Sequence, residues 1–376
     1  MTELAILSQL ISFDSQSHKS NKEIVDYIVG LFASREKEFD FLEVKVTPIM
    51  KGDLEIFNLE VIFRGESSEA PIVFSGHTDT VPTSSKWTKD PFSAQLVDGR
   101  VYGLGSTDMK AGLTSMILTA LSITEKPQQD IYFLFDADEE VVGTGGKEFV
   151  ERLDIKNASI IVAEPTDCSL QVGQKGATDL QVKVFGQSFH SSKTNKEKNA
   201  QFNAVQKAVK IITALQALED KLENMVDDLF GTPSQAVCKI VGGTAGNVIP
   251  DVCEFSISRR LLPSENMEEV LDEMIGIVNA VDPEAETSVL FRGEANLVDQ
   301  ESEFMSVCNK ISQEVLGKAE IKVMSGWTQA GLFKKWGNCL IWGPGTLDMA
   351  HQADEYCELS QIALMTECYK EYINSR

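Results

Sequence analysis

Short, almost wholly apolar segments alternate with helical patterns through the first half of the chain, and this alternation limits the possible folds more than any other feature. The apolar segments predict buried strands at 71–75, 131–135 and 160–163. Helical periodicity predicts helices at 2–12, 21–34, 108–122 and 144–153, the second with Asn21 as its N-cap. Strands interleaved with helices are typical of an α/β fold, in which helices cover both faces of a mixed or parallel sheet.

The pattern changes after residue 175. Strands are predicted at 178–185, 236–241, 252–259 and 286–291, with helices at 200–224 and 265–281. This order, β-α-β-β-α-β, is the split βαβ (ferredoxin-like) arrangement, which folds as a unit of one sheet and its helices. The earlier pattern then resumes. We therefore expect an inserted α+β domain at 176–290 between two parts of one α/β domain, 1–175 and 291–376.

The chain is strongly acidic, with 57 acidic against 34 basic residues and a net charge of −23. Nucleic acid and anionic membranes are bound by clustered Lys and Arg, so we expect neither as a partner. No apolar run approaches the roughly 18–20 residues of a membrane helix, and the amino terminus does not resemble a secretory signal. Seven dispersed cysteines without a CxxC pair favour reduced thiols. These features predict a cytoplasmic protein.

Two of the four histidines stand in carboxylate-rich motifs: His77 in SGHTD (75–79) and His351 in AHQADEY (350–356). Between them, four acids follow strand or turn signals: Asp108, Glu139, Glu140 and Glu164. Imidazole and carboxylate ligands, with no cysteine among them, suit zinc or a similar divalent metal that supports hydrolysis. Ligands of α/β sheets gather where strands end, and this is where His77 and Glu164 are predicted to lie.

Local spacing suggests how these groups divide the work. In an extended segment His77 and Asp79 point to the same side, so Asp79 can orient the imidazole by a hydrogen bond. In DADEE (136–140) adjacent side chains diverge. One glutamate can therefore bind a metal while its neighbour faces a water whose pKa the metal has lowered.

Each motif also has a simpler interpretation when it is taken alone. HxD can be a surface turn, Asp108 a helix N-cap, DADEE a solvated acidic loop, and Glu164 an exposed acid after a strand. His351 can be an ordinary loop histidine, and His190, in GQSFHSS (186–192), part of a polar surface turn. The ordered co-occurrence of the motifs favours the metal site.

The same motifs resemble those of the zinc-dependent M20 family of aminoacylases, deacetylases and carboxypeptidases, and the resemblance covers nearly the whole chain. It is carried by SGHTDTVP (75–82), WTKDPF (87–92), YGLGSTDMK (102–110), AEPT (163–166), GQSFHSS (186–192), GPG (343–345) and AHQADEY (350–356). Leu104 and the segments around Trp87 and Gly343 are most similar to the bacterial acetylornithine deacetylase branch.

The resemblance implies two zinc ions per subunit, which cobalt can replace. His77 and Glu164 would bind one ion, Glu140 and His351 the other, and Asp108 would bridge both. Glu139 would be the general base, Asp79 would orient His77, and the Asp108–Met109 peptide would be cis.

In this family the inserted domain is a lid through which two subunits form a homodimer. His190 would stabilise the oxyanion in the partner subunit's site. Asn247 and Arg260 would hold the substrate carboxylate, and Lys175, at the hinge, is a weaker candidate. The chain departs from the family at Ser258 and Gln329, where acids are common, and the Gln329 segment is expected to line the substrate pocket.

The implied activity is a zinc-dependent amidohydrolase that removes the acetyl group from N2-acetyl-L-ornithine, a small-molecule N-acyl amino acid, in arginine biosynthesis. The alternatives are deacetylation of acetylcitrulline, desuccinylation of succinyl-diaminopimelate, dipeptide hydrolysis, or metal-retaining binding without catalysis. His18 has no predicted role.

Overall fold

Two units, formed by different parts of the chain, make up the computed structural model, which describes residues 1–376. Unit 1 comprises Met1–Gly173, Leu297–Met324 and Thr328–Arg376, and unit 2 comprises Gln174–Asn296 and Ser325–Trp327. Unit 2 is thus inserted in the sequence of unit 1. The predicted domain boundaries, 176 and 290, both lie inside unit 2.

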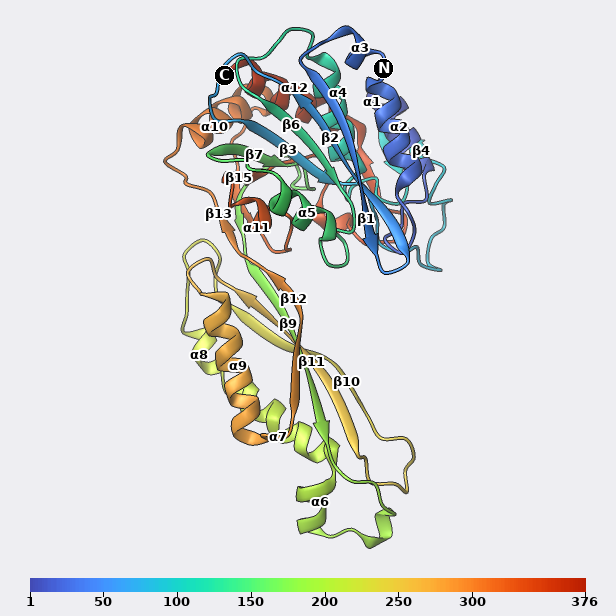
Figure 1. Ribbon diagram of the computed structural model, residues 1–376, viewed down its shortest axis with the longest axis vertical. Helices are drawn as coiled ribbons and strands as arrows, with labels where there is room; N and C mark the ends of the chain where they lie inside the picture. Colours follow the sequence, from blue (N-terminus) through green and yellow to red (C-terminus); the bar gives the residue numbers. More distant parts are fainter. The chain divides into compact units, whose positions relative to one another are not determined.

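Unit 1 is built around a mixed nine-stranded sheet in the order β1-β2-β6-β3-β7-β15-β8-β13, with β14 also paired to β8 (Figure 1). The neighbouring strands β6, β3, β7 and β15 are parallel to one another, and the hairpin β1–β2 and strand β8 are antiparallel to their neighbours in this group. The strands span Leu42–Lys51 (β1), Leu54–Phe63 (β2), Ile72–His77 (β3), Ile131–Asp136 (β6), Ala158–Val162 (β7), Leu170–Gln174 (β8), Asn296–Leu297 (β13), Ile321–Met324 (β14) and Gly337–Ile341 (β15). The predicted α/β fold with a mixed sheet is confirmed.

The helices of unit 1 pack on both faces of this sheet. They span Glu3–Ser12 (α1), Lys22–Phe32 (α2), Arg35–Glu38 (α3), Lys110–Ser122 (α4), Thr144–Arg152 (α5), Glu303–Leu316 (α10), Ala330–Phe333 (α11) and Leu359–Asn374 (α12). A small second sheet, β16-β5-β4, joins Tyr356–Glu358, Arg100–Tyr102 and Gln95–Val97, and a 3₁₀ turn spans Leu347–Met349.

Two local predictions need correction. The helix expected from residue 108 begins at Lys110, so Asp108 lies in the preceding turn and is not its N-cap. Asn21 occupies the N-cap position of α2, but its side chain makes no capping bond. Its amide instead bonds the backbone of Phe57 and the hydroxyl of Thr78, which lies next to His77.

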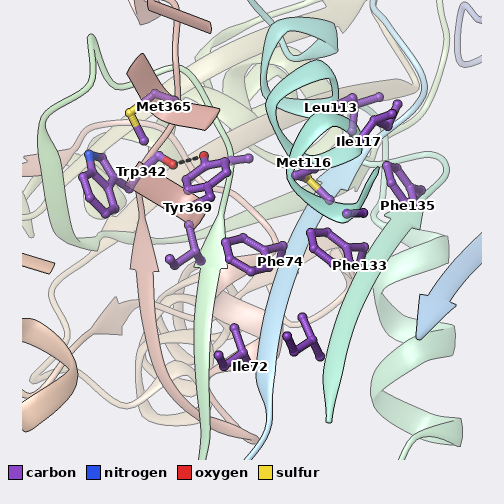
Figure 2. Packing of buried hydrophobic residues seen from close by; sticks show 14 of the residues in the cluster. Ile72, Phe74, Leu113, Met116, Ile117, Phe133, Phe135, Trp342, Met365 and Tyr369 are labelled. Atoms are coloured by element: carbon purple, nitrogen blue, oxygen red, sulfur yellow. Dashed lines mark hydrogen bonds between the residues drawn. The ribbon is translucent and has the colours of Figure 1, made fainter. Parts of the chain in front are cut away.

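Aromatic side chains fill the core between the parallel strands and helices α4 and α12 (Figure 2). Phe74 stacks on Phe133 with ring centroids 5.0 Å apart, and Tyr369 packs against Phe74 at 5.1 Å. The Tyr369 hydroxyl donates to the carbonyl of Trp342, so the one polar group of this ring is satisfied. Burial of each such side chain contributes roughly 1.5–3 kcal/mol, which fixes the strands that end at the candidate site.

Unit 2 contains a four-stranded antiparallel sheet in the order β10-β11-β9-β12. Its elements follow the sequence Gly176–Phe185 (β9), Ser191–Lys193 (3₁₀), Lys196–Phe202 (α6), Ala204–Gln216 (α7), Glu219–Glu223 (α8), Ser234–Gly242 (β10), Val252–Leu261 (β11), Met267–Val281 (α9) and Glu286–Gly293 (β12). Apolar residues of α7 and α9 pack on residues of β9 and β11 to form a core of their own.

The single helix predicted at 200–224 is wrong, because three helices occupy this stretch. Asn203 has an extended backbone, which ends α6, and its side-chain oxygen accepts a hydrogen bond from the Gln206 N–H, which starts α7. A capping residue inside an amphipathic pattern can therefore divide one predicted helix into two, although the spacing of the apolar residues stays the same.

All seven cysteines are free thiols, and six of them are buried. No helix combines the length and apolar character needed to span a membrane.

Candidate metal centre

The carboxyl ends of three parallel strands bring candidate residues to one edge of the unit 1 sheet. His77 is the last residue of β3 and pairs in register with Asp136, the last residue of β6. On the other side of β3, the Ala163 N–H donates to the carbonyl of Ser75 at 2.9 Å, which places Glu164 beside the end of β3. Parallel strand ends meet in this way in open α/β sheets, where ligands bind.

His77, Asp108 and Glu164 form the first group of candidate ligands. The Nε2 atom of His77 lies 3.2 Å from Asp108 Oδ1 and 3.6 Å from Glu164 Oε1. The His77 and Glu164 side chains are buried, and the Asp108 side chain is 11% exposed. Asp108 comes from the turn before α4, so the group joins two strand ends to a helix start.

Asp108, Glu140 and His351 form the second group. The Nε2 atom of His351 lies 3.0 Å from Glu140 Oε2 and 3.4 Å from Asp108 Oδ2. Asp108 therefore belongs to both groups and turns a different oxygen to each. His351 is half exposed, unlike His77, so the second group lies nearer to solvent.

The charges of this cluster suit bound cations. Burial raises the pKa of both Glu164 and Glu140, and the negative charges of neighbouring acids raise it further. Hydrogen bonds with Asp108 and Glu140 raise the pKa of His351 to about 10. Imidazole nitrogens and carboxylate oxygens are ligands that zinc and similar divalent ions accept. Two groups of such ligands that share one aspartate fit two divalent ions.

The predicted bond between the Asp79 carboxylate and His77 is wrong. The Nδ1 atom of His77 lies 2.9 Å from the backbone carbonyl of Asp79, whereas the Asp79 carboxylate is 3.7 Å away. Because a carbonyl only accepts, Nδ1 carries the hydrogen of a neutral ring and Nε2 keeps its lone pair for a metal. Asp79 thus orients the imidazole through its main chain.

The carboxylate of Asp79 has a different function in the structure. Its oxygens accept the N–H groups of Glu139 at 3.2 Å and Glu140 at 3.4 Å, and the Ser17 hydroxyl donates to it at 2.7 Å. Asp79 therefore holds the backbone of the two glutamates whose side chains were predicted to act as base and ligand.

Glu139 belongs to neither ligand group and is partly exposed. Desolvation of its carboxyl group is the main cause that raises its pKa well above the usual range, and the charge of Glu164 adds to this shift. A carboxyl group outside the ligand groups whose pKa is raised can take up a proton, so the general-base role of Glu139 stays a prediction.

The contacts of Glu355 could not be predicted from the sequence. This side chain is only 2% exposed, and its carboxylate accepts the N–H groups of Gly105 at 2.8 Å, Thr107 at 2.8 Å and Asp108 at 2.9 Å. Burial raises the pKa of Glu355, and the three N–H groups, which favour the ionised carboxylate, oppose this shift. Its position within the His351 motif was the only available signal, because the donors come from a distant turn.

Two motifs from the sequence hold neighbouring segments of the chain in place. A Cβ atom at Gly343 would lie 2.4 Å from the carbonyl oxygen of Ala163, and one at Gly345 would lie 2.1 Å from the hydroxyl of Thr107. Only glycine allows these approaches, which brace the residues next to Glu164 and Asp108. Asp354 in turn accepts the N–H groups of Thr88 and Lys89, at 2.9 and 3.0 Å, and so anchors the WTKDPF segment.

The Gln329 side chain faces the interior, and the expectation that its segment lines the substrate pocket stays a prediction. It is fully buried, and its amide nitrogen lies 3.2 Å from a carboxylate oxygen of Asp136, which is also buried. Burial raises the pKa of Asp136 to about 7. The departure at this position therefore concerns the support of the strand end beside His77.

Three other predicted site residues, His190, Asn247 and Arg260, belong to unit 2. His190 forms a bridge with Val248, and the Ser191 N–H donates to the Asn247 carbonyl at 2.9 Å, so the His190 and Asn247 segments lie side by side. His190 is exposed, and its Nδ1 accepts the Ser192 N–H at 3.2 Å, which leaves the ring hydrogen on Nε2 in the neutral form.

Arg260 is distinguished from its neighbour by strand alternation. Arg259 is buried, and its guanidinium pairs with Glu265 at 2.5 Å. Successive residues of β11 point to opposite faces, so Arg260 lies on the other side and is partly exposed. His18 is exposed and has no assigned role.

Comparisons with known proteins agree with this geometry. A family model described as peptidase family M20/M25/M40 matches residues 73–375. The chain is 29% identical to an acetylornithine deacetylase of Erwinia tasmaniensis over 369 residues, which cover 96% of this chain and 92% of the relative.

Two solved structures share the fold. A M20 family metallo-carboxypeptidase from Sulfolobus solfataricus has a TM-score of 0.78 at 17% identity, covering 99% of this chain and 98% of that one. A dinuclear metal binding peptidase of the M20 family from Bacillus subtilis has a TM-score of 0.70 at 15% identity, with coverages of 99% and 96%. Because the family model spans both ligand groups, from β3 to the last helix, the chain belongs to peptidase family M20/M25/M40, whose members are metal-dependent hydrolases.

Proposed function

We propose that the protein is a two-metal amidohydrolase that removes the acetyl group from N2-acetyl-L-ornithine and releases L-ornithine and acetate. The observation that carries this proposal is the sharing of Asp108 between two ligand groups, with Glu139 beside them but outside both. The choice of substrate rests on the similarity to acetylornithine deacetylases along nearly the whole chain. This activity would supply ornithine for arginine biosynthesis, in the cytoplasm.

Two zinc ions, with cobalt as a substitute, would be held by His77, Glu164, Glu140 and His351, with Asp108 shared between them. When bound, they would supply an acidified water and positive charge for the developing oxyanion. A solved relative is described as dinuclear metal binding, which supports two ions rather than one. Glu139 takes the proton from the water and delivers it to the leaving amine, while Asp79 holds its backbone in place.

Unit 2 is proposed to act as a lid of ferredoxin-like topology and as the dimer interface. The Nε2–H of the exposed His190 is a free donor for the oxyanion, which develops in the partner subunit's site. Asn247, on the adjoining segment, and Arg260 would bind the substrate carboxylate, for which a guanidinium is suited by its paired donors. Lys175 is a weaker candidate, because its amino group already donates to the Thr232 carbonyl.

The substrate assignment predicts a specific pattern of hydrolysis. We expect acetate release from N2-acetyl-L-ornithine with added zinc or cobalt, and much slower release of products from acetylcitrulline, succinyl-diaminopimelate and dipeptides. A chelator should abolish the activity, and fresh metal should restore it. Amine release measured across this panel tests the assignment. A preference for another member would move the substrate within the same chemistry, and no turnover at full metal occupancy would indicate a binding protein.

Dimerisation through unit 2 gives a second prediction. Strand β10 is an edge of its sheet, and Ile240 and Val241 on it are 50% and 59% exposed. Exposed apolar edges favour pairing with another chain, and lysine on such an edge opposes it. We expect Ile240→Lys to convert a dimer to a monomer in light scattering and to lower turnover, because His190 would lose its partner.

The matched control is Leu96→Lys, on a strand of unit 1 where the leucine is 46% exposed. This variant should remain dimeric and active. A monomeric Ile240→Lys protein with full activity would contradict a role of His190 in the other subunit.

A further inference from the structure

We propose that Glu355 is a positioning residue whose carboxylate fixes the backbone of Asp108 and thereby sets the affinity of both metal positions. The proposal rests on the proposed function only in that two ions bind at the two ligand groups. Glu355 itself belongs to neither group.

The contacts of the Glu355 carboxylate all go to main-chain N–H groups of one turn. One carboxylate oxygen accepts the N–H groups of Thr107 and Asp108, and the other accepts that of Gly105. These donors lie in the turn before α4, where no helical partner is available, and the turn is buried. A carboxylate accepting several N–H groups forms strong, charge-assisted bonds, so the turn has one defined conformation.

This conformation decides where the Asp108 side chain points. Asp108 offers Oδ1 to His77 and Oδ2 to His351, so a rotation of its main chain would move both oxygens at once. The N–H of Asp108 is itself one of the three groups that Glu355 holds. A change in the conformation of this turn would therefore disturb both ligand groups together.

The segment that contains Glu355 also carries a candidate ligand. Glu355 and His351 stand in one short motif, and His351 contacts Glu140 and Asp108. The motif thus supplies a ligand to the second group and holds the main chain of the residue common to both. Removal of a residue that holds a metal ligand in place without binding the metal itself typically lowers metal affinity by roughly 10–100-fold.

The test is a titration of the metal-free protein with Co²⁺, followed by calorimetry and by the visible absorption of the bound ion. In Glu355→Gln one oxygen becomes an NH₂ group that faces N–H donors, so the turn loses part of its support. We expect affinity for both ions to fall by roughly 10–100-fold and the absorption spectrum to change. Glu358→Gln is the matched control, because Glu358 is exposed and pairs only with the side chain of Arg100. Its affinity and spectrum should stay those of the parent protein.

A purely structural role for Glu355 would lower the melting temperature but leave affinity and spectrum of the folded variant unchanged, and this result would overturn the proposal. A loss confined to one ion would also overturn it, since the effect would then not pass through Asp108. Should Glu355→Gln fail to fold, Glu355→Asp keeps the charge but is one methylene too short to reach all three donors. The same loss is expected there, and unchanged affinity would refute the proposal.

These titrations need no substrate. A parent protein that binds two ions but hydrolyses no member of the panel would refute the proposed function and leave the role of Glu355 standing.

Discussion

Replacing Glu139 with alanine is expected to remove nearly all amide hydrolysis while two metal ions stay bound. Glu139 lies outside both ligand groups, so its loss deletes no ligand. In the proposed mechanism Glu139 moves the proton, and loss of a general base typically lowers turnover by roughly 10²–10⁴-fold. The measurement is kcat for acetate release, together with the metal content of the same sample.

Two further variants sharpen this test. Glu139→Gln keeps the shape of the side chain but cannot accept the proton, so it should be as inactive as the alanine variant. Glu151→Ala removes an exposed glutamate of α5 and should leave turnover and metal content unchanged. An active Glu139→Ala protein would refute the assigned base, and an inactive one that has lost metal would show that Glu139 is a ligand.

The sequence could predict which side chains meet because the strand topology determines where most of them lie. Once 71–75, 131–135 and 160–163 are buried parallel strands, His77 and Glu164 must approach each other at their carboxyl ends. The structure brings the five predicted ligands together in two groups that share Asp108. Their binding of metal remains a prediction.

What the sequence could not predict depends on tertiary contacts of the main chain. Glu355 bonds a turn that is distant in sequence, and His77 is oriented by the carbonyl of Asp79 rather than by its carboxylate. No residue pattern records which backbone groups lack partners in the folded state. The division of the helix at 200–224 had a local cause, Asn203, whose capping function is visible only when its backbone is extended.

Asp108 should have the largest effect of any single residue on metal content, because it alone serves both groups. We expect Asp108→Ala to lose both ions and all turnover. Glu164→Ala should chiefly weaken the first ion and Glu140→Ala the second, since each carboxylate belongs to one group. Metal stoichiometry at equal free Co²⁺ should therefore fall toward zero in the first variant and toward one in the other two.

The physical reason is that Asp108 supplies one of the three candidate ligands in each group. Its oxygens lie 3.2 Å from His77 Nε2 and 3.4 Å from His351 Nε2, and the loss of both leaves each group with one imidazole and one glutamate. Two ligands hold a divalent ion poorly, because such sites usually need at least three from the protein. Asp154→Ala, at an exposed position of unit 1, controls for the loss of an acidic charge and should bind both ions. An Asp108→Ala protein that retained one ion at full affinity would show that the aspartate serves a single ion, and the two-metal site would then have to be reduced to one.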